Sequence, residues 1–265
     1  MARVNSLLLL TLLSLGSPVV AAPPSGLERG MPEDLGFSSQ RLALVHKMLL
    51  QHVEDGRVAG LVAGVARHGE VVYLESMGWN NIEQENPMLE DSIFQIRSMS
   101  KPITAVAAMQ LIEQGKMNLQ DPVSKFIPSF GNARVFIDPD AADFSETRAT
   151  SRGMTIEDLL LNTAGLSHRF GALYRQNEVR SRGDSLEQLV EKVATVPLLG
   201  DPGARWVYSI SLTVLGRIIE IVSGQDFDDY LNEHVYGPLQ MDDTAFYVNE
   251  AKAQRLAHAY RVSPE

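Results

Sequence analysis

Residues 94–104 of the chain read Phe94-Gln95-Ile96-Arg97-Ser98-Met99-Ser100-Lys101-Pro102-Ile103-Thr104. The pattern changes within this stretch, because a short apolar run gives way to a helix that has Pro102 in its first turn. Apolar residues then recur at helical spacing as far as Gly115. Ser98 therefore falls at the start of a helix, where free N–H groups and the helix dipole favour negative charge.

Ser98 and Lys101 form a Ser-x-x-Lys motif, and a spacing of three places both on the same helical face. A serine hydroxyl needs a base to become a nucleophile, and a lysine beside it in a dry pocket can supply or relay one. The alternative is an N-capping serine followed by a surface lysine. The motif alone leaves both interpretations open.

A second candidate is Tyr208, in Arg205-Trp206-Val207-Tyr208-Ser209-Ile210-Ser211 just before another expected helix. A loop tyrosine can present its phenol toward the Ser98 hydroxyl. Lys101 beside it would favour the phenolate by opposite charge, making Tyr208 a usable proton acceptor. The alternative is an aromatic wedge between helix and loop.

The rest of the chain predicts one hairpin and a large helical part, without a linker or repeat. Ser38 or Ser39 caps a helix, and two β-prone runs meet at His68-Gly69. Thr155 with Asp158, and Ser185 with Gln188, form capping boxes that open further helices. The remaining expected elements are the strands 58–66 and 71–74, a polar loop over 138–152, and helices over 212–222 and 227–235 closed by Gly224 and Gly237.

Composition excludes several functions. The chain has 265 residues, 45% hydrophobic, with a net charge of −10, and acidity of this kind disfavours a nucleic-acid binder. No cysteine is present, which excludes disulfides and thiolate chemistry. There is no His-Glu-x-x-His zinc motif and no Gly-x-Ser-x-Gly elbow. Neither a metal nor an organic cofactor is implied.

The N-terminal residues predict a secretory signal peptide. Arg3 precedes an apolar run, and Val19 and Ala21 are the small residues that a cut after Ala21 requires. We expect residues 1–21 to be removed and residues 22–265 to form the exported domain, in the periplasm or outside the cell, without a stable membrane anchor. The alternative is an uncleaved anchor.

Together the motifs resemble the serine β-lactamase-related family, which includes class C β-lactamases, DD-peptidases and esterase and acyltransferase relatives. The resemblance runs from about Leu35 to Val248 and is carried by residues 94–104, 119–128, 154–160, 163–166 and 208–224. It implies an α+β fold of the β-lactamase/transpeptidase type: an antiparallel sheet flanked by helices, plus a helical subdomain. It also implies that Ser98 is the acylated nucleophile, Lys101 its proton-relay partner and Tyr208 the tyrosine of the second motif. The backbone N–H of Ser98 would be one oxyanion donor.

The sequence departs from the family pattern in three places. Ile210 stands where the Tyr-x-Asn motif has the asparagine that contacts the lactam side chain in β-lactamases, which favours the esterase-like branch. Asn162 stands where relatives often carry histidine. After Tyr208 no Lys-Ser/Thr-Gly or His-x-Gly follows, so we expect a domain that lacks its C-terminal strands and one oxyanion donor, a loss worth about 10²–10³ in rate.

Three functions follow from this resemblance. The first is an exported serine esterase or acyl-transfer enzyme acting on a small ester. The second is a β-lactamase or DD-peptidase acting on lactams or peptidoglycan stems. The third, of another class, is a truncated envelope binding protein without catalysis.

Overall fold

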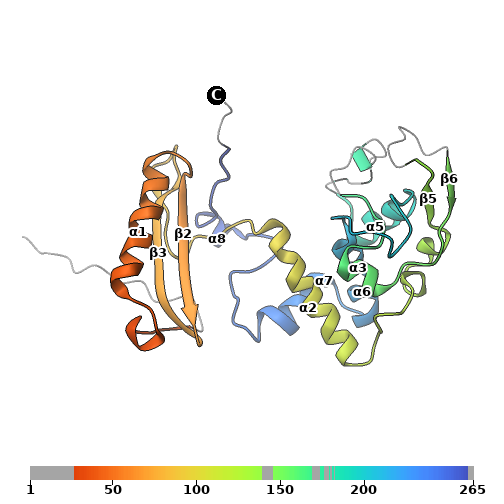
Figure 1. The fold of residues 1–265 in the computed structure, drawn as a ribbon, viewed down its shortest axis with the longest axis horizontal. Coiled ribbons are helices and arrows are strands. Elements are labelled where there is room, and N and C mark those ends of the chain that lie inside the picture. The colour runs from red at the N-terminus through yellow and green to blue at the C-terminus, as the bar shows by residue number, and fades with distance from the viewer. Residues whose placement is uncertain are drawn as a thin grey trace, which may run out of the picture. The chain divides into compact units, whose positions relative to one another are not determined.

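A computed structural model of the chain describes residues 27–138, 146–168, 174, 175, 179, 181 and 183–261. The chain divides into two compact units (Figure 1). The first unit consists of residues 1–92 and 257–265, and the second of residues 93–256. The mixture of helices and strands confirms the predicted α+β class. The predicted signal peptide lies outside the described residues.

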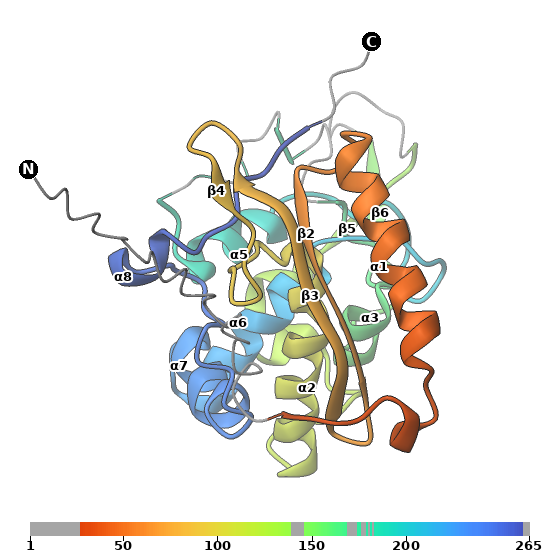
Figure 2. The ribbon, with the colours of Figure 1, turned by 90° about the vertical axis from the view of Figure 1, so that its left-hand side faces the viewer.

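The first unit is a hairpin covered by one helix. Strands β2 (Gly60–Arg67) and β3 (Glu70–Asn81) pair antiparallel around a turn in which His68 and Gly69 have φ of 53° and 85°. Two positive φ values are what a tight two-residue hairpin turn requires, which confirms the predicted hinge. Helix α1 (Ser39–Glu54), capped by Ser38, runs along the hairpin (Figure 2).

Two short strands also pair with β3. The two-residue strand β1 (Glu28–Arg29) pairs parallel with β3, and β4 (Asn86–Pro87) pairs antiparallel with it. The parallel pairing of β1 has no signal in the sequence, because two residues are too short for a periodicity. An ion pair between His46 of α1 and Glu75 of β3 joins the helix to the sheet.

The chain leaves the first unit after Ser92 and returns to it at residue 257. Within the second unit the two ends are joined, because the Ile93 N–H donates to the Arg255 carbonyl at 2.7 Å. After the return, the His258 N–H bonds to the Asn80 carbonyl at 3.1 Å, and the Ile82 N–H bonds to the Tyr260 hydroxyl at 2.8 Å.

The second unit is mainly helical and is built around α6 (Ser211–Ser223). Four apolar residues of α6 (Val214, Leu215, Ile218 and Ile219) have no exposed surface. Burying each such side chain contributes about 1.5–3 kcal/mol. The other helices are α2 (Ser100–Glu113), α3 (Ile156–Leu161), α5 (Leu186–Ala194), α7 (Phe227–Leu231) and α8 (Glu250–Ala253).

The sequence signals for helix ends hold in the second unit. Both capping boxes form, at Thr155 with Asp158 and at Ser185 with Gln188. Gly224 ends α6 with a φ of 74°. The helix expected over 227–235 differs in detail, because α7 ends at Leu231 and continues as a π-helical turn, Asn232–Tyr236.

The expected polar loop over 138–152 is partly wrong. Strand β6 (Thr147–Ala149) lies within it and pairs antiparallel with β5 (Arg134–Phe136), with Arg134 opposite Ala149. A strand of three residues without apolar alternation has no pattern from which it could be predicted. Among the residues described, none of the helices combines the length and apolar character that crossing a membrane requires.

Two irregular segments of the second unit lie side by side. The exit segment, residues 162–167, follows α3, and the tyrosine loop, residues 199–210, precedes α6. Backbone hydrogen bonds join them, including Leu199 N–H to the Gly165 carbonyl at 2.8 Å and Gly203 N–H to the Thr163 carbonyl at 2.8 Å. Gly165 has a φ of 78°, and a Cβ atom there would lie 2.2 Å from the Gly200 carbonyl oxygen.

This close approach predicts the cost of a methyl group at Gly165. Gly165→Ala adds both left-handed strain and a backbone clash, so the free energy of unfolding is expected to fall by about 3 kcal/mol. Gly115→Ala is the matched control, because Gly115 has a φ of 70° with nothing within 4 Å of the added Cβ. It should cost only about 1 kcal/mol. Equal losses in urea titrations would show that the two segments are not tightly packed at Gly165.

Candidate functional site

Ser98 lies in a single 3₁₀ turn, Arg97–Met99, that leads directly into α2. The Met99 N–H closes the turn on the Ile96 carbonyl at 2.9 Å. The Ser100 hydroxyl donates to the Arg97 carbonyl at 2.7 Å, which holds the turn against the helix. Ser98 is exposed. Its position at the N-terminal end of α2 is the one that the sequence pattern predicts.

The residue before Ser98 has a strained backbone. Arg97 has a φ of 50°, in the left-handed region that residues other than glycine adopt at a cost of about 1–3 kcal/mol. This conformation could not be predicted from the residue type, because arginine does not favour it. Such a conformation persists only where the surrounding structure holds it in place.

Lys101 connects the two other predicted residues. Its ammonium nitrogen Nζ donates to Ser98 Oγ at 3.2 Å, which agrees with the spacing of three along the helix. The same Nζ lies 4.7 Å from the centre of the Tyr208 ring. A cation over an aromatic face is attracted by about 0.5–2 kcal/mol. Lys101 thus brings together residues that are more than 100 positions apart in the sequence.

Tyr208 also lies among other aromatic rings. The His168 ring stacks on it with centres 5.5 Å apart and planes at 27°, and the Trp206 ring is tilted at 6.2 Å. Trp206 is 65% exposed, an unusual position for a large apolar ring. Sequence reasoning missed both neighbours. Trp206 could have been found from its place two residues before Tyr208, whereas His168 is brought there only by the fold.

Ile210 and Asn162, which both depart from the family pattern, have different surroundings. Ile210 is only 5% exposed and belongs to the apolar core of the second unit. Its N–H donates to the Ser167 carbonyl at 3.2 Å. Asn162 instead ends α3 with a φ of 56° and a ψ of 37°, and its side-chain oxygen accepts from the N–H and the hydroxyl of Ser209, each at 3.3 Å.

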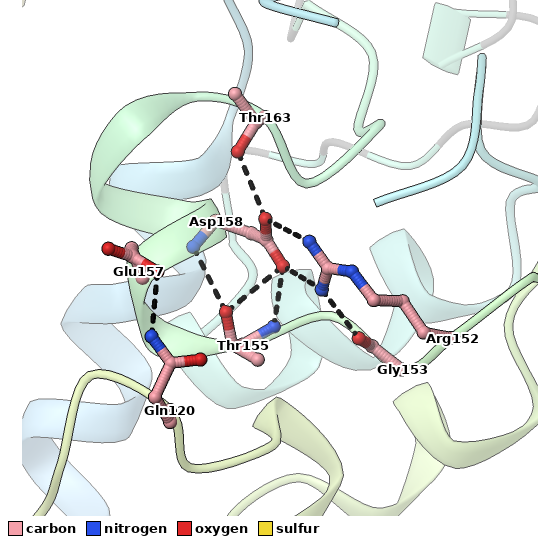
Figure 3. Close-up of polar contacts among 7 residues, drawn as sticks. All are labelled: Gln120, Arg152, Gly153, Thr155, Glu157, Asp158 and Thr163. Atoms are coloured by element: carbon pink, nitrogen blue, oxygen red, sulfur yellow. Dashed lines mark hydrogen bonds and ion pairs between the residues drawn. The ribbon is translucent and has the colours of Figure 1, made fainter. Parts of the chain in front are cut away.

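A buried carboxylate supports this part of the unit (Figure 3). Asp158 accepts two hydrogen bonds from Arg152, at 2.6 and 2.8 Å, and two from Thr155, at 2.9 and 3.0 Å. The Thr163 hydroxyl adds another at 3.0 Å. Burial by itself raises the pKa of Asp158, but the hydrogen bonds from Arg152, Thr155 and Thr163 outweigh it and leave the pKa below its usual value.

The described residues offer no evident place for a metal. Among them, no three histidine, aspartate or glutamate side chains gather closely enough to hold a metal ion. The three residues Ser98, Lys101 and Tyr208 contribute a hydroxyl, an ammonium group and a phenol.

Comparison with known proteins gives consistent matches. A family model described as β-lactamase matches residues 45–265. Esterase EstB of Burkholderia gladioli is 34% identical over 218 residues, covering 79% of this chain and 52% of EstB. Acyltransferase mokF of Monascus pilosus is 26% identical over 225 residues, covering 82% of this chain and 54% of mokF.

Among solved structures, the chain is similar to EstCE1, a hydrolase with promiscuous acyltransferase activity. The TM-score is 0.75 at 33% identity, with 85% of this chain and 58% of EstCE1 covered. Together with the family match, this similarity confirms the predicted β-lactamase/transpeptidase-like fold. The chain spans about half the length of the curated relatives it matches.

The strain at Arg97 predicts an effect on stability. Arg97→Gly should raise the free energy of unfolding by up to about 1 kcal/mol, because glycine adopts positive φ without penalty. Arg97→Val is the opposing variant and should lower it by about 1–2 kcal/mol, since β-branched residues fit that region worst. Thermal unfolding of the three proteins tests this. A loss of stability in Arg97→Gly would mean that the arginine side chain outweighs the strain.

The carboxylate of Asp158 predicts a dependence of stability on pH. A pKa that is lower in the folded than in the unfolded chain, where it is about 3.9, means that the stabilisation is complete above that value. It is lost as the pH falls below about 4, through the folded pKa.

Asp158→Asn should therefore be less stable at pH 7 by about 2 kcal/mol and lose less stability on acidification. Parallel pH curves for Asp158→Asn and the unsubstituted protein would contradict the prediction.

Proposed function

Because the chain belongs to the β-lactamase family, we propose that it is an exported serine hydrolase that cleaves small carboxylic esters through an acyl group on Ser98. The observation that carries the proposal is the position of Lys101, whose ammonium group contacts both the Ser98 hydroxyl and the Tyr208 ring. A serine in hydrogen-bond contact with an activating cation, next to a second titratable group, is the arrangement that nucleophilic catalysis needs.

The proposed reaction has two halves. In the first, Ser98 Oγ attacks the ester carbonyl carbon while its proton passes to the phenolate of Tyr208, which the charge of Lys101 stabilises. The carbon–oxygen bond to the alcohol then breaks, and the alcohol leaves with that proton. In the second half, water attacks the acyl carbon and Tyr208 takes a proton from the water. The bond between the acyl carbon and Ser98 Oγ then breaks, Tyr208 returns that proton to Ser98 Oγ, and the carboxylic acid leaves. An alcohol in place of water gives acyl transfer.

The N-terminal end of α2 has a role in this scheme. The tetrahedral intermediate carries a negative oxygen, and the backbone N–H of Ser98 is proposed to donate to it. The dipole of α2 adds positive potential at the same place, since Ser98 precedes the first turn of that helix.

Two observations favour esters over lactams. The similar proteins named esterase EstB and acyltransferase mokF are named for ester and acyl-transfer chemistry. In this chain, moreover, the third position of the Tyr-x-Asn pattern is Ile210, whose side chain is buried in the core. It offers no amide to a lactam side chain.

The alternative is a β-lactamase or DD-peptidase using the same nucleophile. The description of the matching family model favours it, and the chemistry of attack is identical. A non-catalytic binding protein of the cell envelope is the third possibility, which requires an unreactive Ser98. Export rests on residues 1–21 of the sequence alone.

Labelling of Ser98 tests the proposal. Incubation with a fluorophosphonate should add a single phosphonyl group, detected by intact mass, and Ser98→Ala should abolish it. Ser223→Ala, at the C-terminal end of α6, is the matched serine control and should label normally. Short-chain nitrophenyl esters should be hydrolysed, with turnover at least about 10³-fold lower in Ser98→Ala.

The other outcomes separate the alternatives. Rapid hydrolysis of penicillin with no ester turnover would assign the lactam function instead. A folded protein that neither labels nor hydrolyses either substrate would be a binding protein.

A further inference from the structure

We propose that Asn162 is the positioning residue that fixes Tyr208 in place over Lys101, and that the Asp158 carboxylate anchors Asn162. The inference rests on the proposed function, in which Tyr208 transfers the proton. Asn162 stands where members of the family often have a histidine.

Asn162 holds the backbone on both sides of Tyr208. The Val207 N–H donates to the Asn162 carbonyl at 2.9 Å, and the Ser209 N–H donates to the Asn162 side-chain oxygen Oδ1 at 3.3 Å. Hydrogen bonds at the preceding and following residues fix the direction in which the Tyr208 Cβ leaves the chain. The ring then keeps only its own two side-chain rotations.

The hydroxyl of Ser209 strengthens this connection and extends it to α6. Ser209 and Ser211 are 4% and 0% exposed, and their hydroxyl oxygens are 2.6 Å apart. The Ser211 N–H donates to Ser209 Oγ at 3.2 Å, and Ser209 Oγ lies 3.3 Å from Asn162 Oδ1. The tyrosine loop is therefore tied at its end both to Asn162 and to the first residue of α6.

Asparagine suits this position for two independent reasons. The backbone at Asn162 is left-handed, with a φ of 56°, a conformation that asparagine, aspartate and glycine adopt most readily. The side chain must also present an oxygen to the two donors of Ser209. Glycine meets the first requirement only, whereas aspartate meets both.

The anchor lies one turn earlier in α3 (Figure 3). Asp158 accepts from the Thr163 hydroxyl through its carboxylate at 3.0 Å and from the Thr163 N–H through its backbone carbonyl at 2.9 Å. Thr163 directly follows Asn162. Arg152 and Thr155 donate hydrogen bonds to the same carboxylate. Asn162 is therefore connected, through its neighbour Thr163, to a buried carboxylate that accepts several hydrogen bonds.

Loss of this support should affect the reaction step more than substrate binding. A displacement of about 1 Å in a reacting group can lower the rate about 100-fold. Substrate binding depends on other contacts, so KM should change little while kcat falls.

The test compares Asn162→Gly with Asn162→Asp in the full chain. With a nitrophenyl ester, Asn162→Gly should lower kcat about 10- to 100-fold with KM within about threefold, because the backbone conformation is kept and only Oδ1 is lost. Asn162→Asp keeps the acceptor and should stay within about fivefold of the original kcat. Gln240→Gly, at another left-handed residue of the second unit with a φ of 55°, controls for the added glycine and should leave kcat unchanged.

A measurement independent of turnover separates this inference from the proposed function. The ring carbons of Tyr208, labelled and assigned by NMR with Tyr208→Phe, should give one signal that Asn162→Gly shifts or broadens and Asn162→Asp preserves. An unchanged signal and unchanged kcat in Asn162→Gly would overturn the positioning role. If the protein lacks esterase activity, the proposed function fails, while the NMR comparison still decides the role of Asn162. Should Asn162→Gly not fold, Ser209→Ala removes one of the same bonds, and an unaltered Tyr208 signal in it would count against the role.

Discussion

The buried carboxylate of Asp158 is the constraint on which the site region depends. Removing a negative charge from water costs free energy unless hydrogen bonds replace those lost to the solvent. The Asp158 carboxylate therefore requires the donors Arg152, Thr155 and Thr163 within hydrogen-bond distance. Arg152 precedes α3, Thr155 is the N-cap of that helix, and Thr163 follows its end. One side chain therefore fixes the start of the helix, its end and the segment that leaves it.

The shared packing of α2 and α6 sets the second constraint. Ser98 and Lys101 belong to the start of α2, whereas Tyr208 lies just before α6, and both helices contribute fully buried residues to one core, among them Ala107 and Ile218. Close-packed interiors resist small displacements. The contact between Lys101 and Tyr208 is thus a consequence of helix packing as well as of local bonds.

Much of this arrangement could be predicted from residue types with strong local preferences. Serine and threonine caps located α1, α3 and α5, and Gly115 and Gly224 marked the ends of α2 and α6. A spacing of three sufficed to bring Lys101 to Ser98. These signals act within one turn of chain, so no tertiary information was needed.

The features that the sequence did not reveal depend on contacts between distant residues or on strain. The stacking of His168 on Tyr208 and the bonds from Asn162 to the tyrosine loop join residues about 40 positions apart. The positive φ of Arg97 is imposed by its surroundings against its own preference. Strand β6 is too short and too exposed to leave a pattern. Tertiary structure decides each of these cases.

The path of the chain has a consequence for the order of folding. The second unit is inserted into the first, which is assembled from residues on either side of it. Because Ile93 bonds to Arg255, the two ends of the insertion meet inside the inserted unit. Closing a loop costs entropy that grows with the logarithm of its length. Once the inserted unit has folded, most of the entropy of closing this loop has already been lost. The hydrogen bonds that join residues 257–261 to Asn80 and Ile82 then form at little further entropic cost. The interrupted unit is therefore expected to complete its structure last.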